Sequence, residues 1–445
     1  MRRKITSDLW DWKNNSKGKV AALIVGARRV GKSHIVEEFA KEAYKSYLLI
    51  DFTKVSDQIK DLFLHQADDF DTFFTLLQAY YNITFYERNT VLVFDEVEAF
   101  PRARELIKHF VADGRYDYIE TGSLMSIRKN VEGILIPSEE REFQMCPMDF
   151  EEFLWALGED ETYARIQSLY TAKKPLGQAL HRKMMTLFRQ YMIVGGMPQA
   201  VQEYVNSHNF KLVDKEKRDI LKLYNDDIEK HGGKEALRIK QIYNLIPAQL
   251  SEVNKRFMFS KISELARYRE YENALFWLNE AKIVNLCHNT NEPIIGLAAR
   301  MDISAFKCYQ CDTGLLLSQT FSEKDLAQEE IYKKLLFNKL EFNNGFMMEN
   351  VVAQMLVAAG HDLYYYAESE DRMEVDFLLT KNKITTRKNI WALEVKSGKG
   401  YSITSLEKYQ NKFSQQVGEC YVLHDGDMEV KDNITFLPVY MAGML

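Results

Sequence analysis

The chain has 445 residues, of which 46% are hydrophobic, 12% aromatic and 27% charged, and its formal net charge is -6. This length exceeds the roughly 300 residues that a single hydrophobic core usually supports, so two or three domains are expected. The acidic balance excludes a general electrostatic attraction to nucleic acid, and any such contact has to come from a local basic surface.

The N-terminal stretch and the cysteines indicate the compartment. Residues 1–15 begin with basic residues and continue too polar for the apolar core of a secretory signal. No run of about 18 apolar residues occurs, so no membrane span is expected. Five cysteines are few for this length and fit a reducing compartment, so we expect a cytoplasmic protein. Cys308 and Cys311 have metal-ligand spacing, but no second pair follows, which favours packed thiols over a zinc site.

Short apolar runs alternate with helical patterns between residues 20 and 150. The runs are residues 20–25, 46–51, 91–94 and 116–119. Continuous apolar strands of this kind are buried on both faces, as in a parallel sheet covered by helices. The pattern predicts an α/β fold with a doubly wound parallel sheet.

Residues 26–33 match the P-loop pattern Gly-x-x-x-x-Gly-Lys-Ser, between an apolar strand and a helix expected over residues 34–43. The glycines let backbone N–H groups face phosphates at the positive end of the helix. Lys32 is expected to reach the β- and γ-phosphates of ATP, and Ser33 to ligate Mg2+. A chance glycine turn is the alternative. The residues expected to line the nucleotide are Gly26, Ala27, Arg28, Arg29, Val30, Gly31, Lys32 and Ser33.

An acidic pair, Asp95 and Glu96, ends the third apolar run. Asp95 is expected to hold the magnesium shell and Glu96 to polarise the attacking water, although such a pair also starts a helix by capping. Thr121 follows the next run and is either a phosphate sensor or a helix N-cap. Three arginines could stabilise charge in phosphoryl transfer, within one subunit or across the interface of a homo-oligomer: Arg28, Arg29 and Arg141.

The pattern turns helical from about residue 150 to residue 330. Residues 260–268 and 271–284 indicate two helices and a following strand, as in a winged helix, although two short amphipathic helices also occur in any helical bundle. If this part binds DNA, the expected contacts are Lys261, Arg267 and Arg269.

Beyond residue 337, a helix over residues 347–359 and strands over 363–366, 374–379 and 390–395 predict a small α/β sheet domain.

Acidic residues interrupt these C-terminal strands. Asp376 lies inside one strand, and Glu394 and Lys396 are two apart on another, hence on one face. Charges inside apolar strands are costly unless they are paired or bind a metal. Two carboxylates, with Glu349 as a third, could hold Mg2+ while the lysine orients water for phosphodiester cleavage. The alternatives are a solvated strand edge, a simple Glu–Lys pair, or the same fold used for partner recognition.

Five segments of the chain carry a resemblance to known proteins: residues 26–33, 95–96, 121–123, 142–154 and 191–198. Together they resemble a prokaryotic family of AAA-type ATPases, whose members join the ATPase to a winged helix and a C-terminal restriction-endonuclease-like domain. The resemblance implies an ATPase with a helical lid over residues 1–210, a winged helix over 211–325 and a nuclease-like domain over 326–445. It also places Asp376, Glu394 and Lys396 in the three positions of the Asp…Glu-x-Lys nuclease signature.

Two functions fit this organisation. In the first, the ATPase moves or gates DNA, the winged helix holds it and the C-terminal site cuts it. In the second, the protein is a regulatory or scaffold ATPase whose nucleotide state switches its contacts with a protein partner, and the nuclease-like domain is inert. The intact Asp376, Glu394 and Lys396 favour the first, and the acidic net charge favours the second.

Overall fold

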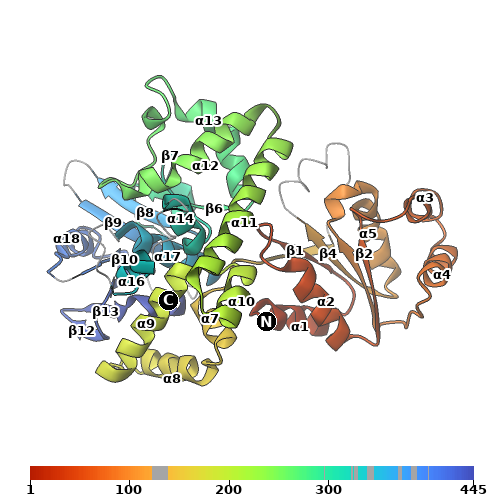
Figure 1. Ribbon diagram of the computed structural model, residues 1–445, viewed down its shortest axis with the longest axis horizontal. Coiled ribbons are helices and arrows are strands. Elements are labelled where there is room, and N and C mark those ends of the chain that lie inside the picture. Colours follow the sequence, from red (N-terminus) through yellow and green to blue (C-terminus); the bar gives the residue numbers. More distant parts are fainter. Residues whose placement is uncertain are drawn as a thin grey trace. The chain divides into compact units, whose positions relative to one another are not determined.

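The computed structural model describes residues 1–122, 139–294, 296–321, 324, 329–337, 345–368, 373–381, 388–398 and 400–445. The chain divides into two compact units, Met1–Cys146 and Pro147–Leu445, and each has a β-sheet of its own (Figure 1). The α/β fold class expected from the sequence is confirmed: a parallel sheet, then helices, then a sheet domain near the C-terminus.

Unit 1 is built on a five-stranded sheet with the order β2-β3-β4-β1-β5, and every neighbouring pair is parallel. The central strands β1, β3 and β4 are buried along their whole length, whereas the edge strands β2 and β5 are partly exposed. The strands are β1 (Ala21–Val25), β2 (Ser46–Asp51), β3 (Thr90–Asp95), β4 (Asp117–Gly122) and β5 (Glu140–Gln144). The four apolar runs of the sequence therefore correspond to β1–β4.

Helices supply the rest of unit 1. They are α1 (Ile5–Ser16), α2 (Lys32–Ala43), α3 (Asp57–His65), α4 (Phe70–Tyr81) and α5 (Pro101–Asp113), with a 3-10 turn η1 (Val97–Ala99). Aromatic side chains of α3, α4 and α5, among them Phe63, Phe73 and Phe110, share one core with alternate strand residues such as Leu23 and Leu92. Helix α2 contacts β2, β3 and β4.

The strand order determines where the site of unit 1 lies. In a parallel sheet the carboxyl ends of all strands meet at one edge, and ligands bind there. The P-loop follows β1, Asp95 ends β3, and Thr121 lies near the end of β4. Because β4 lies directly between β3 and β1, these three segments are brought to one place.

Unit 2 begins with a run of helices. Helix α7 starts at a capping box, in which the Asp149 side chain accepts from the backbone N–H of Glu152 and the Glu152 side chain accepts from that of Asp149. Among the described residues, no helix combines the length and the apolar content needed to cross a bilayer. The first helices are α7 (Phe150–Ala156), α8 (Asp160–Thr171), α9 (Gln178–Val194), α10 (Pro198–Ser207), α11 (Phe210–His231), α12 (Ala236–Ser251) and α13 (Tyr268–Glu280), with 3-10 turns η2 (Gly233–Glu235) and η3 (Phe259–Lys261).

The sheet of unit 2 has eight strands in the order β12-β13-β11-β10-β9-β8-β6-β7. Strands β6 and β7 form an antiparallel hairpin, and β6 joins the remaining strands through parallel pairing with β8. The sheet therefore combines strands from both sides of residue 325. The strands are β6 (Val284–Thr290), β7 (Met301–Gln310), β8 (Tyr364–Glu368), β9 (Met373–Thr380), β10 (Ile390–Val395), β11 (Val417–His424), β12 (Glu429–Lys431) and β13 (Ile434–Pro438).

The remaining elements of unit 2 include the helix expected over residues 347–359, which is confirmed as α17. They are η4 (Leu297–Arg300), α14 (Thr313–Thr320), α16 (Glu329–Leu336), α17 (Gly345–Ala358), α18 (Thr404–Lys412) and η5 (Val439–Met444).

The helix expected over residues 260–268 is not formed. Only the 3-10 turn η3 lies there, while the following helix α13 and strand β6 are present. An amphipathic helix forms when it can bury its apolar side chains, but Leu265 is 81% exposed. This part of the chain therefore has one helix fewer than the winged-helix interpretation expects. In addition, the hairpin that would be the wing is part of the eight-stranded sheet.

Candidate functional site

The P-loop of unit 1 connects β1 to α2. Gly26 is required because a Cβ there would come 2.2 Å from the carbonyl oxygen of Met145. Gly31, just before α2, has a φ of 93°, and Arg29 has a φ of 70°. A left-handed backbone at these two positions turns the loop tightly before the helix begins, as a phosphate-binding loop needs.

Lys32 is the first residue of α2, and its side chain folds back over the loop. Its Nζ donates to the carbonyl oxygens of Gly26, at 3.0 Å, and Ala27, at 3.3 Å. Burial lowers the pKa of Lys32, and the nearby carboxylates of Glu96, Glu98 and Asp95 oppose this. Among the described residues, this buried ammonium donates to two neutral carbonyls, which it can exchange for the charged oxygens of a phosphate.

The side chains of Ser33, Asp95 and Thr121 meet at the carboxyl edge of the sheet. Ser33 Oγ donates to Asp95 Oδ1 at 2.7 Å, and Thr121 Oγ1 donates to the same oxygen. The backbone N–H of Glu96 donates to Thr121 Oγ1 at 3.4 Å. The structure thus brings together the two residues predicted to hold magnesium and the predicted sensor.

Glu96 lies one position beyond the strand, with a φ of 51°. A left-handed conformation at a residue other than glycine costs about 1–3 kcal/mol and is concentrated at functional sites. The chain therefore turns sharply directly after Asp95, where β3 ends.

The arginines predicted to act at this site lie in two places. Arg28 and Arg29 are exposed on the loop, whereas Arg141 is exposed on β5, where it pairs with Ala22 toward the amino end of β1. Sequence reasoning missed Arg3, whose buried guanidinium donates to the carbonyl oxygens of Val30, at 2.9 Å, and Cys146, at 2.6 Å. Arg3 therefore braces the P-loop from the N-terminus, and the only signal in the sequence was a short basic stretch without a motif.

Comparison with protein families agrees with this geometry. A family model described as "AAA domain" matches residues 19–154. Over these residues the chain is similar to AAA-type domains, and it carries the P-loop there. Two further models match the rest of the chain, both described as domains of unknown function: DUF8612 over residues 185–325 and DUF4143 over residues 344–441. No curated protein matches the chain.

Solved structures similar to this chain are distant. A Walker-type ATPase of Pyrococcus abyssi is 13% identical with a TM-score of 0.41, covering 72% of this chain and 96% of its own. A variant of RuvB from Thermotoga maritima is 11% identical with a TM-score of 0.31, covering 64% and 89%. The Aeropyrum pernix ORC1 protein in complex with DNA is 9% identical with a TM-score of 0.26, covering 74% and 94%.

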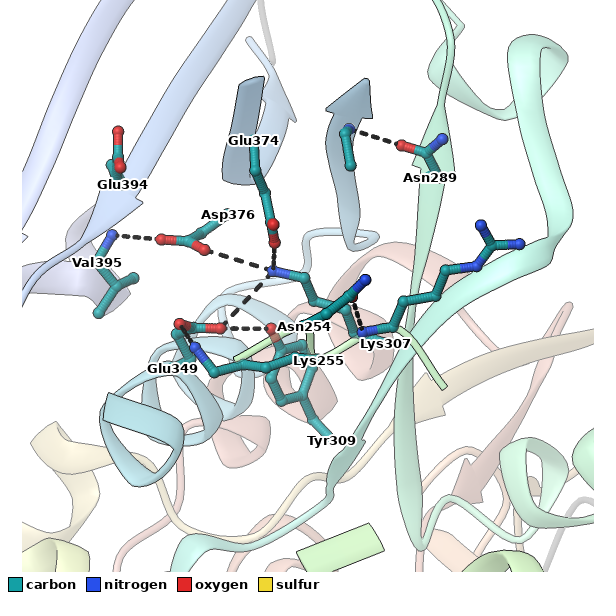
Figure 2. Close-up of polar contacts among 12 residues, drawn as sticks. Asn254, Lys255, Asn289, Lys307, Tyr309, Glu349, Glu374, Asp376, Glu394 and Val395 are labelled. Carbon is teal, nitrogen blue, oxygen red and sulfur yellow. Dashed lines mark hydrogen bonds and ion pairs between the residues drawn. The ribbon is translucent and has the colours of Figure 1, made fainter. Parts of the chain in front are cut away.

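A second group of charged residues lies in unit 2. We call Glu349, Glu374, Asp376 and Glu394 the carboxylate cluster (Figure 2). Glu349 comes from α17, Glu374 and Asp376 from β9, and Glu394 from β10. Strand pairing between β9 and β10 places these two elements side by side. Figure 2 shows the Glu394 carboxyl directed away from the other three.

Ammonium groups already contact this cluster. Lys307 Nζ, from β7, lies 2.7 Å from Glu374 Oε1, 3.4 Å from Asp376 Oδ1 and 3.8 Å from Glu349 Oε2. Two further ion pairs join Lys255 to Glu349 Oε1 and Lys396 to Glu394 Oε1, the latter at 2.5 Å. Two neutral donors also contact the cluster: the Tyr309 hydroxyl donates to Glu349 Oε2 at 3.2 Å, and the Val395 N–H donates to Asp376 Oδ2 at 2.9 Å.

The electrostatics follow from burial and from these charges. Burial, and next the charge of Asp376, raise the pKa of Glu394 to about 7, and its buried Oε2 has no hydrogen-bond partner among the described residues. The same two causes raise the pKa of Glu349. Burial lowers the pKa of Lys307, but Tyr309 and the carboxylates of Glu349, Asp376 and Glu374 reverse this and hold it well above its usual value.

The expected magnesium ligands of unit 2 therefore do not fit a divalent metal as they stand. Within the residues that the structure describes, no three Asp, Glu, His or Cys side chains are gathered so that they could hold a metal ion. Asp376 and Glu349 share the ammonium of Lys307, and Lys396 pairs with Glu394. Cys308 and Cys311 are both buried free thiols, and burial raises the pKa of Cys308.

Proposed function

We propose that the AAA domain binds ATP with Mg2+ and hydrolyses it. The observation that carries this proposal is that Ser33 and Thr121 both donate to one oxygen of Asp95, beside a P-loop whose lysine donates to carbonyl groups of the loop itself. Hydrolysis of a nucleoside triphosphate requires ligands for a cation and a loop that binds the phosphates. The chain places residues suited to both at the same edge of the sheet.

Each residue has a role in this proposal. The loop N–H groups and Lys32 bind the phosphates, and Ser33 together with Asp95 hold the cation. Magnesium, when bound, offsets phosphate charge and orients the γ-phosphate. Glu96 polarises the attacking water as general base. Thr121 positions Asp95 through its hydroxyl and Glu96 through its contact with the backbone N–H.

The test is phosphate release by the full chain with saturating ATP and Mg2+. Lys32→Ala removes the fixed charge opposite the phosphates, so the rate should fall about 100-fold or more. The matched control is Lys41→Ala, which removes an exposed lysine from the same helix, where it pairs with Glu37. The control should keep the wild-type rate. Wild-type turnover in Lys32→Ala would overturn the assignment.

We further propose that the ATPase acts on a protein partner rather than on nucleic acid. Support comes from the charges near α13. Arg267 and Arg269 are exposed there, but Lys261 pairs with Glu252 at 2.9 Å. Exposed acids intervene in the same stretch: Glu264, Glu270 and Glu272. A surface of mixed sign attracts a phosphate backbone weakly, because few counterions are released.

Duplex DNA titrated into the protein at low salt tests this choice. We expect no binding and no stimulation of the ATPase. Binding that weakens steeply with salt, and that disappears when Arg267 and Arg269 are changed to Glu, would instead support the DNA function. For the protein switch, hydrogen exchange of the Glu96→Gln variant with and without ATP should differ on the surface of residues 147–445. Identical exchange with and without ATP would contradict the proposal that the nucleotide state switches contacts with a protein partner.

A further inference from the structure

We propose that the ammonium group of Lys307 permanently occupies the cation position of the carboxylate cluster, so that the wild-type chain closes this cluster to divalent metals. The proposal concerns unit 2 alone and does not depend on ATP hydrolysis. It follows from the position of the ammonium, its confinement and the local balance of charge.

The position of Lys307 is central. Its Nζ lies within 4 Å of carboxylate oxygens from three residues on two elements, Glu349 of α17 and Glu374 and Asp376 of β9. Figure 2 shows these three carboxyl groups directed at the one ammonium. Oxygens that converge from several elements on one point are the usual surroundings of a bound cation. In this chain a lysine provides that cation.

The ammonium is also confined. The Lys307 side chain is 1% exposed and belongs to the buried part of β7. Its Nζ lies 5.1 Å from the centre of the Tyr365 ring, which belongs to β8. A side chain on the inner part of a strand cannot swing into solvent unless the strand leaves its neighbours. An arriving metal therefore cannot displace the ammonium at small cost.

The charge balance leaves little for a metal to neutralise. Four carboxyl groups of the cluster meet three ammonium groups, those of Lys255, Lys307 and Lys396. A divalent ion placed among them would lie close to the fixed charge of Lys307. Repulsion between like charges in a buried site is strong because water does not screen it. The ion would therefore gain much less than in a cluster of carboxylates alone.

Lys307 also joins two parts of the sheet. Strands β6 and β8 share only two paired positions, His288 with Tyr364 and Asn289 with Tyr365. The lysine adds ion pairs between β7 and the elements α17 and β9, which lie on the other side of residue 325. This connection gives a structural role to a buried lysine whose neighbours in the strand, Phe306 and Cys308, are buried and uncharged.

Calorimetric titration of the full chain with Mn2+ alone, without nucleotide, tests the proposal. Wild type and Asp376→Asn should give the same isotherm, because the cluster binds no metal in either. Lys307→Met keeps the length of the side chain and removes its charge, so it should gain one Mn2+ site with an affinity at least about tenfold above any in wild type. The double variant Lys307→Met, Asp376→Asn should lose that site, which assigns it to the cluster. Lys261→Met, which changes an exposed lysine, is the control and should gain nothing.

Two results would overturn the proposal. One is a Mn2+ site in the wild type that Asp376→Asn or Glu374→Gln removes. The other is a folded Lys307→Met variant, checked by circular dichroism, that gains no site. If Lys307→Met does not fold, the comparison of wild type with Glu374→Gln still decides, since the Glu374 side chain is 44% exposed and we expect an amide to be accommodated there.

Discussion

Asp95 in unit 1 and Asp376 in unit 2 are both acidic residues on buried strands, but their partners differ. Asp95 accepts hydrogen bonds from the hydroxyl groups of Ser33 and Thr121, whereas Asp376 contacts the ammonium of Lys307. A hydroxyl has no net charge, so the charge of Asp95 remains for an incoming cation. The ammonium has already neutralised Asp376. The comparison teaches that the partner of a buried acid, more than its position on a strand, decides whether it can take a metal.

The largest effect is expected from the catalytic base of unit 1. Glu96→Gln keeps the shape of the side chain but removes its ability to accept a proton, so turnover should fall about 100-fold or more while ATP binding remains. Nucleotide affinity and single-turnover phosphate release measure the two parts separately. If both change together, Glu96 would be a binding residue, and the assignment of roles around Asp95 would need revision.

Removal of the ammonium from unit 2 should destabilise the protein. Without metal, Lys307→Met removes the ammonium that Glu349, Glu374 and Asp376 share and leaves Asp376 with the Val395 N–H as a neutral donor, at a cost of about 3–5 kcal/mol. Hydrogen exchange of peptides from β7 and β9 reports this free energy locally. The control is Lys261→Met, which removes an exposed ion pair and should change this free energy by less than about 1 kcal/mol. Equal effects of the two changes would contradict the difference between the two regions.

The carboxyl group of Glu394 should make the stability of unit 2 depend on pH. Folding raises its pKa from 4.5 to about 7, so the folded chain retains a proton that the unfolded chain releases. The contribution of Glu394 to the free energy of unfolding is fully present below about pH 4.5 and is lost as the pH rises through 7. The loss amounts to at most about 3 kcal/mol. Glu394→Gln should remove this part of the slope. If the free energy of unfolding of the variant and of the wild type changes in parallel between about pH 5 and pH 8, folding does not raise the pKa of Glu394.

The smallest effect on turnover is expected from the loss of the Thr121 hydroxyl, which donates to the Asp95 carboxylate. Thr121→Val has nearly the same shape but cannot donate to Asp95 or accept from the backbone N–H of Glu96. The loss of positioning should lower turnover about tenfold, with ATP affinity nearly unchanged. The ratio of turnover to Michaelis constant, followed against Mg2+ concentration, measures it. A loss of ATP affinity alone would instead fit direct contact of Thr121 with a phosphate.

Sequence reasoning predicted the site of unit 1 better than that of unit 2. Residues 26–33, Asp95 and Thr121 each follow an apolar run, and a parallel sheet brings the ends of such runs together without further information. The helix expected over residues 260–268 was wrong, because periodicity does not show whether a partner surface exists for Leu265. Glu349, Asp376 and Glu394 were correctly expected to be partly or wholly buried, but their counter-ions were not identified beyond Lys396.

By itself the sequence determined the P-loop and the acidic end of the strand beside it, because both are local: a loop between a strand and a helix has nearly the same geometry wherever it occurs. Only the tertiary structure decided the state of the carboxylate cluster. Its central cation, Lys307, lies 69 residues before Asp376 and reaches it only because β6 pairs with β8 and carries β7 into the sheet. A strand pairing between distant segments has no signature in the spacing of residues, and the charge that it brings therefore becomes visible only in the fold.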